Sequence, residues 1–260
     1  METITDSISV HSLKKDAYAR IAARNAADAA TNDGANQAAF RYSLFDHFVA
    51  TFGEPDTRGF RKAQDAFLVS LASYSVVCYL LQIKDRHNGN ILVDREGHVI
   101  RPSSLFRGRA DRVDIDFGFM LSNSPGSIGF EMAPFKLSQD YLDILGGPGS
   151  AKFAEFRALV RRQFRDVRRH AERIIMIVEL MQKDSTLPCY ANGEQTAVQL
   201  RSRFQLGLTQ AQADEFADRL IDSSALSSFS VLYDYFVRRR PWSALTRRSS
   251  RSKRASSNVP

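Results

Sequence analysis

The chain has 260 residues, of which 43% are hydrophobic, so it can bury a core in one large domain or two small ones. Only two cysteines are present, without paired spacing, which argues against a disulfide scaffold and for a reducing compartment. No apolar run approaches the roughly 20 residues that span a bilayer, and the N-terminus lacks a signal-peptide core. We therefore expect a cytoplasmic protein without a transmembrane segment.

The net charge of +7 is unevenly distributed. Residues 101–113 carry four arginines and one aspartate, and residues 238–260 carry eight basic side chains and no acidic one. These two segments supply all of the basicity, and the remainder is mildly acidic. Residues 238–260 also have too little apolar content to fold alone, so we expect a disordered tail there.

The first 39 residues show only weak patterns. Residues 1–17 mix β-branched and polar side chains without clear periodicity, which indicates a short connector. Residues 18–39 are rich in alanine but offer little to bury, which favours a partly helical, poorly packed surface insertion.

Two helices with clear apolar stripes follow. The first stripe lies before a Gly-x-Pro stop and consists of Phe40, Leu44, Phe45, Phe48 and Phe52. The second runs for about six turns at steps of three or four residues and consists of Phe60, Ala63, Phe67, Leu71, Tyr74, Cys78 and Leu81. Such periodicity is typical of a core helix, and this one leads the chain directly to Asp85.

A β-hairpin is predicted after the second helix. Residues 91–100 show a strand, a tight turn and the start of a return strand. Residues 101–112 then lack a strand pattern, and alternation resumes at Val113, Ile115 and Phe117. The return strand is therefore expected to contain a long loop.

The remainder is predicted to be irregular loop and helix. Residues 119–136 are rich in Ser, Gly and Pro, which marks an irregular loop. Helices fit residues 137–145, 151–182, 196–204, 209–221 and 224–237, with a break near Asp166 left open and Thr209 as an N-cap. With one hairpin among many helices, the predicted fold class is α+β, mostly α.

The chemistry lies in one stretch between the second helix and the hairpin. Asp85 is followed five residues later by Asn90, and the motif Asp116-Phe117-Gly118 comes further on. Kinases use such a pattern to place a proton acceptor and two metal ligands around ATP. Mg²⁺ prefers oxygen ligands and keeps several waters, so one carboxylate and one amide suffice beside the nucleotide phosphates.

The order Asp85-Arg86-His87, with Asn88-Gly89-Asn90 attached, resembles the catalytic loop of the phosphatidylinositol 3-/4-kinase superfamily. The resemblance extends from about Phe40 to Phe236 and is nearest to the type III alpha phosphatidylinositol 4-kinases. The segments on which the resemblance rests are residues 79–91, 116–119, 124–126 and 187–189. It implies a kinase-like C-terminal lobe with the β-hairpin beside the catalytic loop.

The resemblance also implies site residues by their position in the motif. Asp85 and His87 act in catalysis, with the acceptor of the hydroxyl proton left open between them, and Asn90 and Asp116 bind Mg²⁺ or Mn²⁺. Arg86 is expected to be structural, bracing the loop. The remaining implied positions are Leu92 and Ile115 beneath the adenine of ATP, and Phe119, Ser124, Pro125 and Gly126 in the activation loop.

In this superfamily the activation loop faces the lipid headgroup. Residues 119–135 contain no Lys or Arg before Lys136, whereas extra phosphates on the inositol ring would need paired cations. This favours unphosphorylated phosphatidylinositol as the substrate.

The chain also departs from the superfamily pattern. The 84 residues before Asp85 show neither the strand-rich pattern nor the glycine-rich loop of an N-lobe, which suggests a C-lobe that lacks the N-lobe. We expect a hinge-like connector with an Ala-rich insertion at 1–39, the C-lobe at 40–237 with a basic inserted loop at 101–113, and a basic disordered tail at 238–260.

Three functions are compatible with these features. The first is a lipid kinase that transfers the γ-phosphate of ATP to the 4-hydroxyl of phosphatidylinositol, at the membrane periphery. The alternatives are an inactive kinase fragment that acts as a membrane or scaffold interaction module, and a protein kinase of the same superfamily. The basic segments either attract anionic lipid or are unrelated sequence joined to a kinase core, and no nucleic-acid partner is expected.

Overall fold

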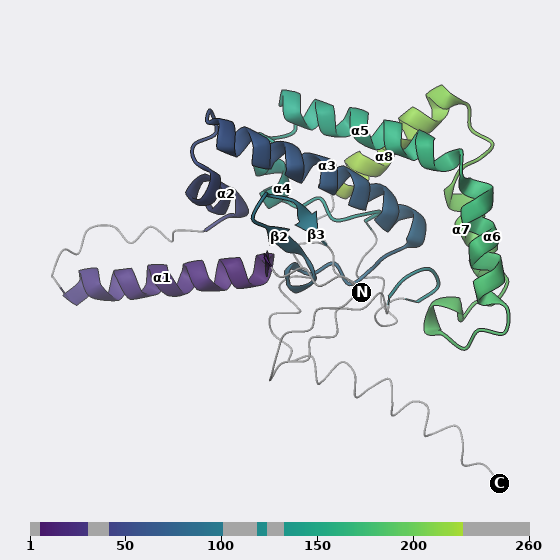
Figure 1. Ribbon diagram of the computed structural model, residues 1–260, viewed down its shortest axis with the longest axis horizontal. Coiled ribbons are helices and arrows are strands. Elements are labelled where there is room, and N and C mark those ends of the chain that lie inside the picture. Colours follow the sequence, from purple (N-terminus) through teal and green to yellow (C-terminus); the bar gives the residue numbers. More distant parts are fainter. Residues whose placement is uncertain (1–5, 31–41, 101–118, 124–132, 226–260) are drawn as a thin grey trace, which may run out of the picture.

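The computed structural model describes residues 6–30, 42–100, 119–123 and 133–225 (Figure 1). These residues form mostly helices with one small sheet, so the predicted α+β class is confirmed. The strand expected at 113–117, the helix expected beyond Ala225 and the basic segments lie outside the described residues.

The sheet has three antiparallel strands in the order β1-β2-β3. The predicted hairpin is confirmed as β2 (Leu92–Asp94) and β3 (Val99–Ile100), but β1 (Ser7–Ser9) pairs along the other edge of β2. The expectation of a connector at 1–17 is therefore wrong. A strand of three residues is too short to show alternation, and its partner lies far along the chain, so only tertiary pairing reveals it.

Helix α1 (Val10–Ala30) follows β1 directly and covers the start of the hairpin. The Val10 N–H donates to the carbonyl of Ile91 at 2.9 Å, and Val10 and Leu13 are buried on one side of the first turn. The helix thus begins well before the predicted alanine-rich insertion, and its first turns pack against the core.

Helix α3 (Arg58–Leu81) is the central element and matches the predicted six-turn stripe. Thr57 caps its N-terminus by accepting from the Phe60 N–H. It packs against α5 (Ala151–Arg168) on one side and β3 on the other (Figure 1). Among the described helices, α3 alone is long and apolar enough to cross a membrane, and 44% of its most apolar window is buried inside. Core helices share that length and composition, and its buried stripe fits this role.

Aromatic side chains join α3 to two shorter helices, α2 (Leu44–Phe52) and α4 (Gln139–Ile144). The Phe48 ring of α2 lies 5.5 Å from Phe67, whose other neighbour, Tyr141 of α4, is also 5.5 Å away, both edge to face. Such pairs add about 0.5–1.5 kcal/mol each beyond the burial of their area. The stripes in the sequence therefore predicted this core correctly, although Phe40 lies outside the described residues.

The last four helices form two pairs. The long helix predicted at 151–182 breaks after Arg168, giving α5 and α6 (Ala171–Gln182), while α7 (Gln195–Arg203) packs on α6 and α8 (Gln210–Ala225) on α5 (Figure 1). Antiparallel ion pairs at four-residue intervals align α5 with α8, namely Arg157–Asp222, Arg161–Asp218 at 2.7 Å and Arg165–Asp214 at 2.6 Å. Spacing of the charges on each helix is visible in the sequence, but their pairing is not.

The turn of the hairpin is organised by Asp94. One carboxylate oxygen accepts the N–H groups of Glu96 at 2.8 Å and His98 at 2.9 Å, and the other contacts the His98 ring at 2.9 Å. Gly97 has a φ of +93°, and a Cβ there would lie 2.7 Å from the Ala63 carbonyl of α3. Burial acts to raise the pKa of Asp94, but the hydrogen bonds from His98 and Glu96 outweigh it, so the pKa is lowered.

We expect Asp94→Ala to lower the free energy of unfolding by about 1–2 kcal/mol near neutral pH, because two backbone donors lose their acceptor. A lowered pKa in the folded state stabilises the fold above the unfolded-state pKa of about 3.9, and this contribution disappears as the pH falls through the folded value. Urea unfolding followed from pH 7 down to about pH 2, below the unfolded-state pKa, should show the difference shrinking at the acid end. The same change at exposed Asp56 is the control, and equal losses at both positions would contradict the role of Asp94.

Candidate active site

The catalytic loop begins where α3 ends. Gln82 closes the helix in the left-handed conformation, and Asp85 also has a positive φ, of +62°. A left-handed backbone costs a residue other than glycine roughly 1–2 kcal/mol, and the conformation persists only where its surroundings impose it. Here the Asn90 side-chain N–H₂ donates to the Asp85 carbonyl at 3.0 Å and to its Oδ2 at 2.9 Å. Both side chains are buried, so this pairing fixes the carboxylate.

The His87 ring lies against the short turn that leads from His87 to Asn90. Its Nδ1 accepts the Gly89 N–H at 3.0 Å, and a Cβ on Gly89 would lie 2.8 Å from the His87 ring, so a larger residue there would push the ring out of place. The other ring nitrogen, Nε2, faces Asp85 Oδ1 at 3.6 Å. Because Nδ1 is an acceptor, a neutral His87 ring carries its proton on Nε2 and points that proton toward Asp85.

Lys136 supports the same loop through two hydrogen bonds. Only 8% of this residue is exposed, and its Nζ donates to the Arg86 carbonyl at 2.9 Å and to Asn88 Oδ1 at 2.8 Å. Arg86 in turn donates from Nη2 to the Ala133 carbonyl at 2.8 Å, a contact that suits the structural role expected for it. The bracing role of Lys136 was not predicted. A single lysine between the apolar residues Phe135 and Leu137 is nevertheless typical of a buried, paired cation.

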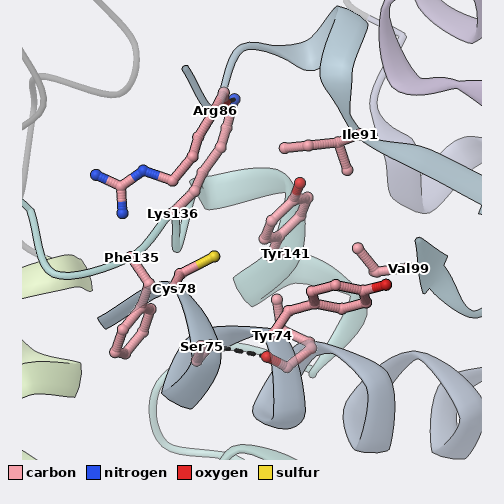
Figure 2. A pocket seen from close by; sticks show the side chains of 10 residues that line it. Tyr74, Ser75, Cys78, Arg86, Ile91, Val99, Phe135, Lys136 and Tyr141 are labelled. Atoms are coloured by element: carbon pink, nitrogen blue, oxygen red, sulfur yellow. Dashed lines mark hydrogen bonds between the residues drawn. The ribbon is translucent and has the colours of Figure 1, made fainter. Parts of the chain in front are cut away.

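A small cavity of about 40 Å³ lies beneath the loop. Figure 2 shows Arg86 and Lys136 on one side of it and Ser75 and Cys78 of α3 on the other. Pockets for ligands of nucleotide size have volumes of about 300–1,000 Å³, so this cavity can hold water but not ATP. A nucleotide would therefore have to lie outside this cavity.

The hairpin places Leu92 next to this loop. Leu92 is 2% exposed but lies outside the main hydrophobic cluster, whereas its neighbours Ile91 and Val93 belong to it. This alternation puts Leu92 on the opposite face of the sheet. Its proposed place beneath the adenine is compatible with that position, and the second residue expected there, Ile115, lies outside the described residues.

The segment that follows the Asp-Phe-Gly motif runs beside the entry to the loop. The Phe119 carbonyl accepts the Lys84 N–H at 2.8 Å, and the Leu121 N–H donates to the Leu81 carbonyl at 2.7 Å. Asp116 is not among the described residues.

The described residues supply part of a metal site. Nowhere in the described ranges do three or more His, Cys, Asp or Glu side chains form a group that could hold a metal ion. The Asn90 amide nitrogen is committed to Asp85, which leaves its carbonyl oxygen, a ligand type suited to Mg²⁺. Asn90 therefore fits the expected role, and its proposed partner Asp116 would supply the carboxylate.

The structure thus brings Asp85, His87 and Asn90 into one cluster, braced through Arg86 and with Leu92 on the adjacent strand. Phe119 begins the expected activation loop next to Lys84. The other predicted site residues, Ile115, Asp116, Ser124, Pro125 and Gly126, lie outside the described residues.

The chain is similar in sequence to known proteins. Residues 3–191 match the family described as phosphatidylinositol 3- and 4-kinase. Phosphatidylinositol 4-kinase PIK1 of Saccharomyces cerevisiae is 46% identical over 237 residues, which are 91% of this chain and 20% of that protein. Phosphatidylinositol 4-kinase pik1 of Schizosaccharomyces pombe is 44% identical, over 91% of this chain and 25% of its own. Phosphatidylinositol 4-kinase beta 1 of Arabidopsis thaliana is 42% identical, over 92% and 18%.

The chain therefore spans about a fifth to a quarter of the length of these relatives. The family match nevertheless covers well over half of the chain and includes the whole cluster around Asp85. This chain belongs to the phosphatidylinositol 3- and 4-kinase family.

Proposed function

We propose that this chain is the C-lobe of a lipid kinase that transfers the γ-phosphate of ATP to the 4-hydroxyl of phosphatidylinositol. The observation that carries the proposal is the buried Asp85–Asn90 pair with His87 facing it at the end of α3. A positioned carboxylate, an amide ligand for the metal and a nearby histidine are what phosphoryl transfer to a hydroxyl requires. The relatives named as phosphatidylinositol 4-kinases support the choice of substrate and of position on the ring.

Asp85 is the better placed acceptor for the hydroxyl proton. The Nδ1 of His87 already accepts the Gly89 N–H, so its other ring nitrogen, Nε2, presents a donor. His87 would then hold a proton beside Asp85 and donate from Nε2 to oxygens that gain negative charge. The divalent cation, when bound by Asn90 and Asp116, neutralises charge on the phosphates.

The substrate proposed is phosphatidylinositol without further ring phosphates. Lys136, the first cation after the expected activation loop, is buried and donates to Arg86 and Asn88 of the catalytic loop. It is therefore not placed to bind a headgroup phosphate, which supports the inference from the cation-poor loop. Because this substrate resides in a bilayer, we propose peripheral contact with a phosphatidylinositol-containing cytoplasmic membrane surface.

The subtype of the kinase is inferred from the names of its relatives. The motifs resemble the alpha type, whereas the relatives from Arabidopsis thaliana and Xenopus tropicalis are named as beta enzymes. We propose the beta type on that ground. ATP with Mg²⁺ or Mn²⁺ is the proposed cofactor set, in keeping with the family.

Replacement of the proton acceptor tests the activity. We expect Asp85→Asn to lower the rate of phosphate transfer from labelled ATP to phosphatidylinositol vesicles by about 10²–10⁴-fold. Asp56→Asn, an exposed change of the same kind, should leave the rate unaltered. No transfer by the unaltered chain, together with no thermal shift on addition of ATP and Mg²⁺, would favour the inactive interaction module instead. Transfer to peptides in place of lipid would favour a protein kinase.

Lys136 should position the loop without touching the substrates. We expect Lys136→Met to lower kcat by about ten- to a hundredfold, because small displacements of catalytic groups are costly, and to leave the KM for ATP within about twofold. The unfolding free energy should also fall by about 1–3 kcal/mol, since two buried acceptors lose their donor. Lys62→Met, at an exposed site on α3, serves as the matched control. A loss of stability with unchanged kcat would leave Lys136 a purely structural residue.

A further inference from the structure

Helix α6 carries apolar side chains on a side that the described fold leaves uncovered. Its inward side buries Ile175 and Val178. Its outward side and the loop that follows expose five large apolar residues by more than half, at 53% for Met176, 53% for Ile177, 69% for Leu180, 55% for Met181 and 56% for Leu187. We call these five residues the α6 apolar face. Contiguous exposed apolar side chains of this kind mark interaction surfaces in proteins.

This face is connected to the segment that leads into the expected activation loop. The Ser122 N–H donates to the Cys189 carbonyl at 3.2 Å, and the Ser122 hydroxyl lies 2.8 Å from that of Thr196. Cys189 belongs to the short turn η2 (Pro188–Tyr190), directly after Leu187. In Figure 1 the lower end of α6 and the segment 119–123 lie on the same side of the molecule. A surface that contacts this face would therefore also lie next to the activation loop.

The chemistry of the face favours lipid over a protein partner. None of the five side chains is an aromatic ring or an arginine, the residues that dominate the binding energy of protein interfaces. The charged residues along the helix and loop, Glu172, Arg173, Glu179, Lys183 and Asp184, are exposed and sum to −1, two basic against three acidic, and Glu172 is paired with Arg201 of α7. Insertion would therefore depend on apolar burial in the acyl region, as for helices that lie in a bilayer interface, and would depend little on salt.

We propose that the α6 apolar face inserts into the bilayer and seats the lobe with its activation loop at the headgroup level. The proposal rests on the proposed function, since a substrate held in a bilayer is what places a lipid surface beside the activation loop. The five side chains would enter the boundary between headgroups and acyl chains, and the polar backbone of α6 would stay satisfied by its own helical hydrogen bonds.

Sedimentation with vesicles of phosphatidylcholine and phosphatidylinositol tests the proposal directly. At high salt, where attraction of the basic tail to anionic lipid is screened, we expect the 260-residue chain to bind. Leu180→Gln with Met181→Gln should lower the partition coefficient at least about tenfold, because two large apolar side chains no longer insert. Val69→Gln with Val77→Gln, which alters exposed apolar residues of α3, is the matched control and should bind as the unaltered chain does. Thermal unfolding of all three proteins checks that they are folded.

Equal binding of the three proteins at high salt would overturn the proposal. So would a dimer in light scattering that only the α6 variant converts to a monomer, because a second copy would then cover the face. A short-chain, water-soluble phosphatidylinositol separates this proposal from the proposed function. If the α6 variant phosphorylates the soluble lipid normally but loses both activity and binding on vesicles, insertion is supported. If no protein phosphorylates either lipid while the difference in vesicle binding persists, the docking surface stands and the proposed activity fails.

Discussion

The hydrogen bonds from the Asn90 amide to Asp85 are the interaction on which the site depends. Asp85 is buried and holds a left-handed backbone, a state that a non-glycine residue keeps only under constraint. The Asn90 side chain supplies that constraint by satisfying both the backbone carbonyl and the carboxylate. One pair of side chains thereby sets the direction of the Asp85 carboxylate and leaves the Asn90 oxygen for the cation that we propose.

The rest of the fold keeps this pair in place. The apolar stripe of α3 packs against α5 and β3, so the end of the helix, and with it the start of the loop, has a fixed position. Lys136 and Arg86 then link the loop to the chain that returns from the expected activation loop. A displacement of that returning chain would thus be transmitted to the Arg86 carbonyl and the Asn88 side chain, on either side of His87. This coupling gives the loop a rigid support although few of its own residues are in regular structure.

One short segment also links the catalytic loop to the region that follows α6. The segment 119–123 joins the entry of the catalytic loop, through Lys84, to the turn η2 that follows α6, through Ser122 and Cys189. The residues proposed for catalysis, the start of the expected activation loop and the exposed apolar side chains of α6 therefore belong to one continuous part of the molecule. For the proposed lipid kinase, such continuity would let a single orientation serve both docking and catalysis.

Local patterns in the chain were sufficient for the helices after α1, the hairpin and the grouping of Asp85, His87 and Asn90 in one loop. Helical stripes such as Phe60 to Leu81 repeat over many turns, and the spacing of the loop motif is itself local, so both can be recognised without a partner. Strand β1, the bracing by Lys136 and the pairing of α5 with α8 depend on residues far apart in the chain, and only tertiary packing decided them. A three-residue strand or a single lysine has no period to recognise, because its meaning lies in the hydrogen-bond partner that the fold brings to it.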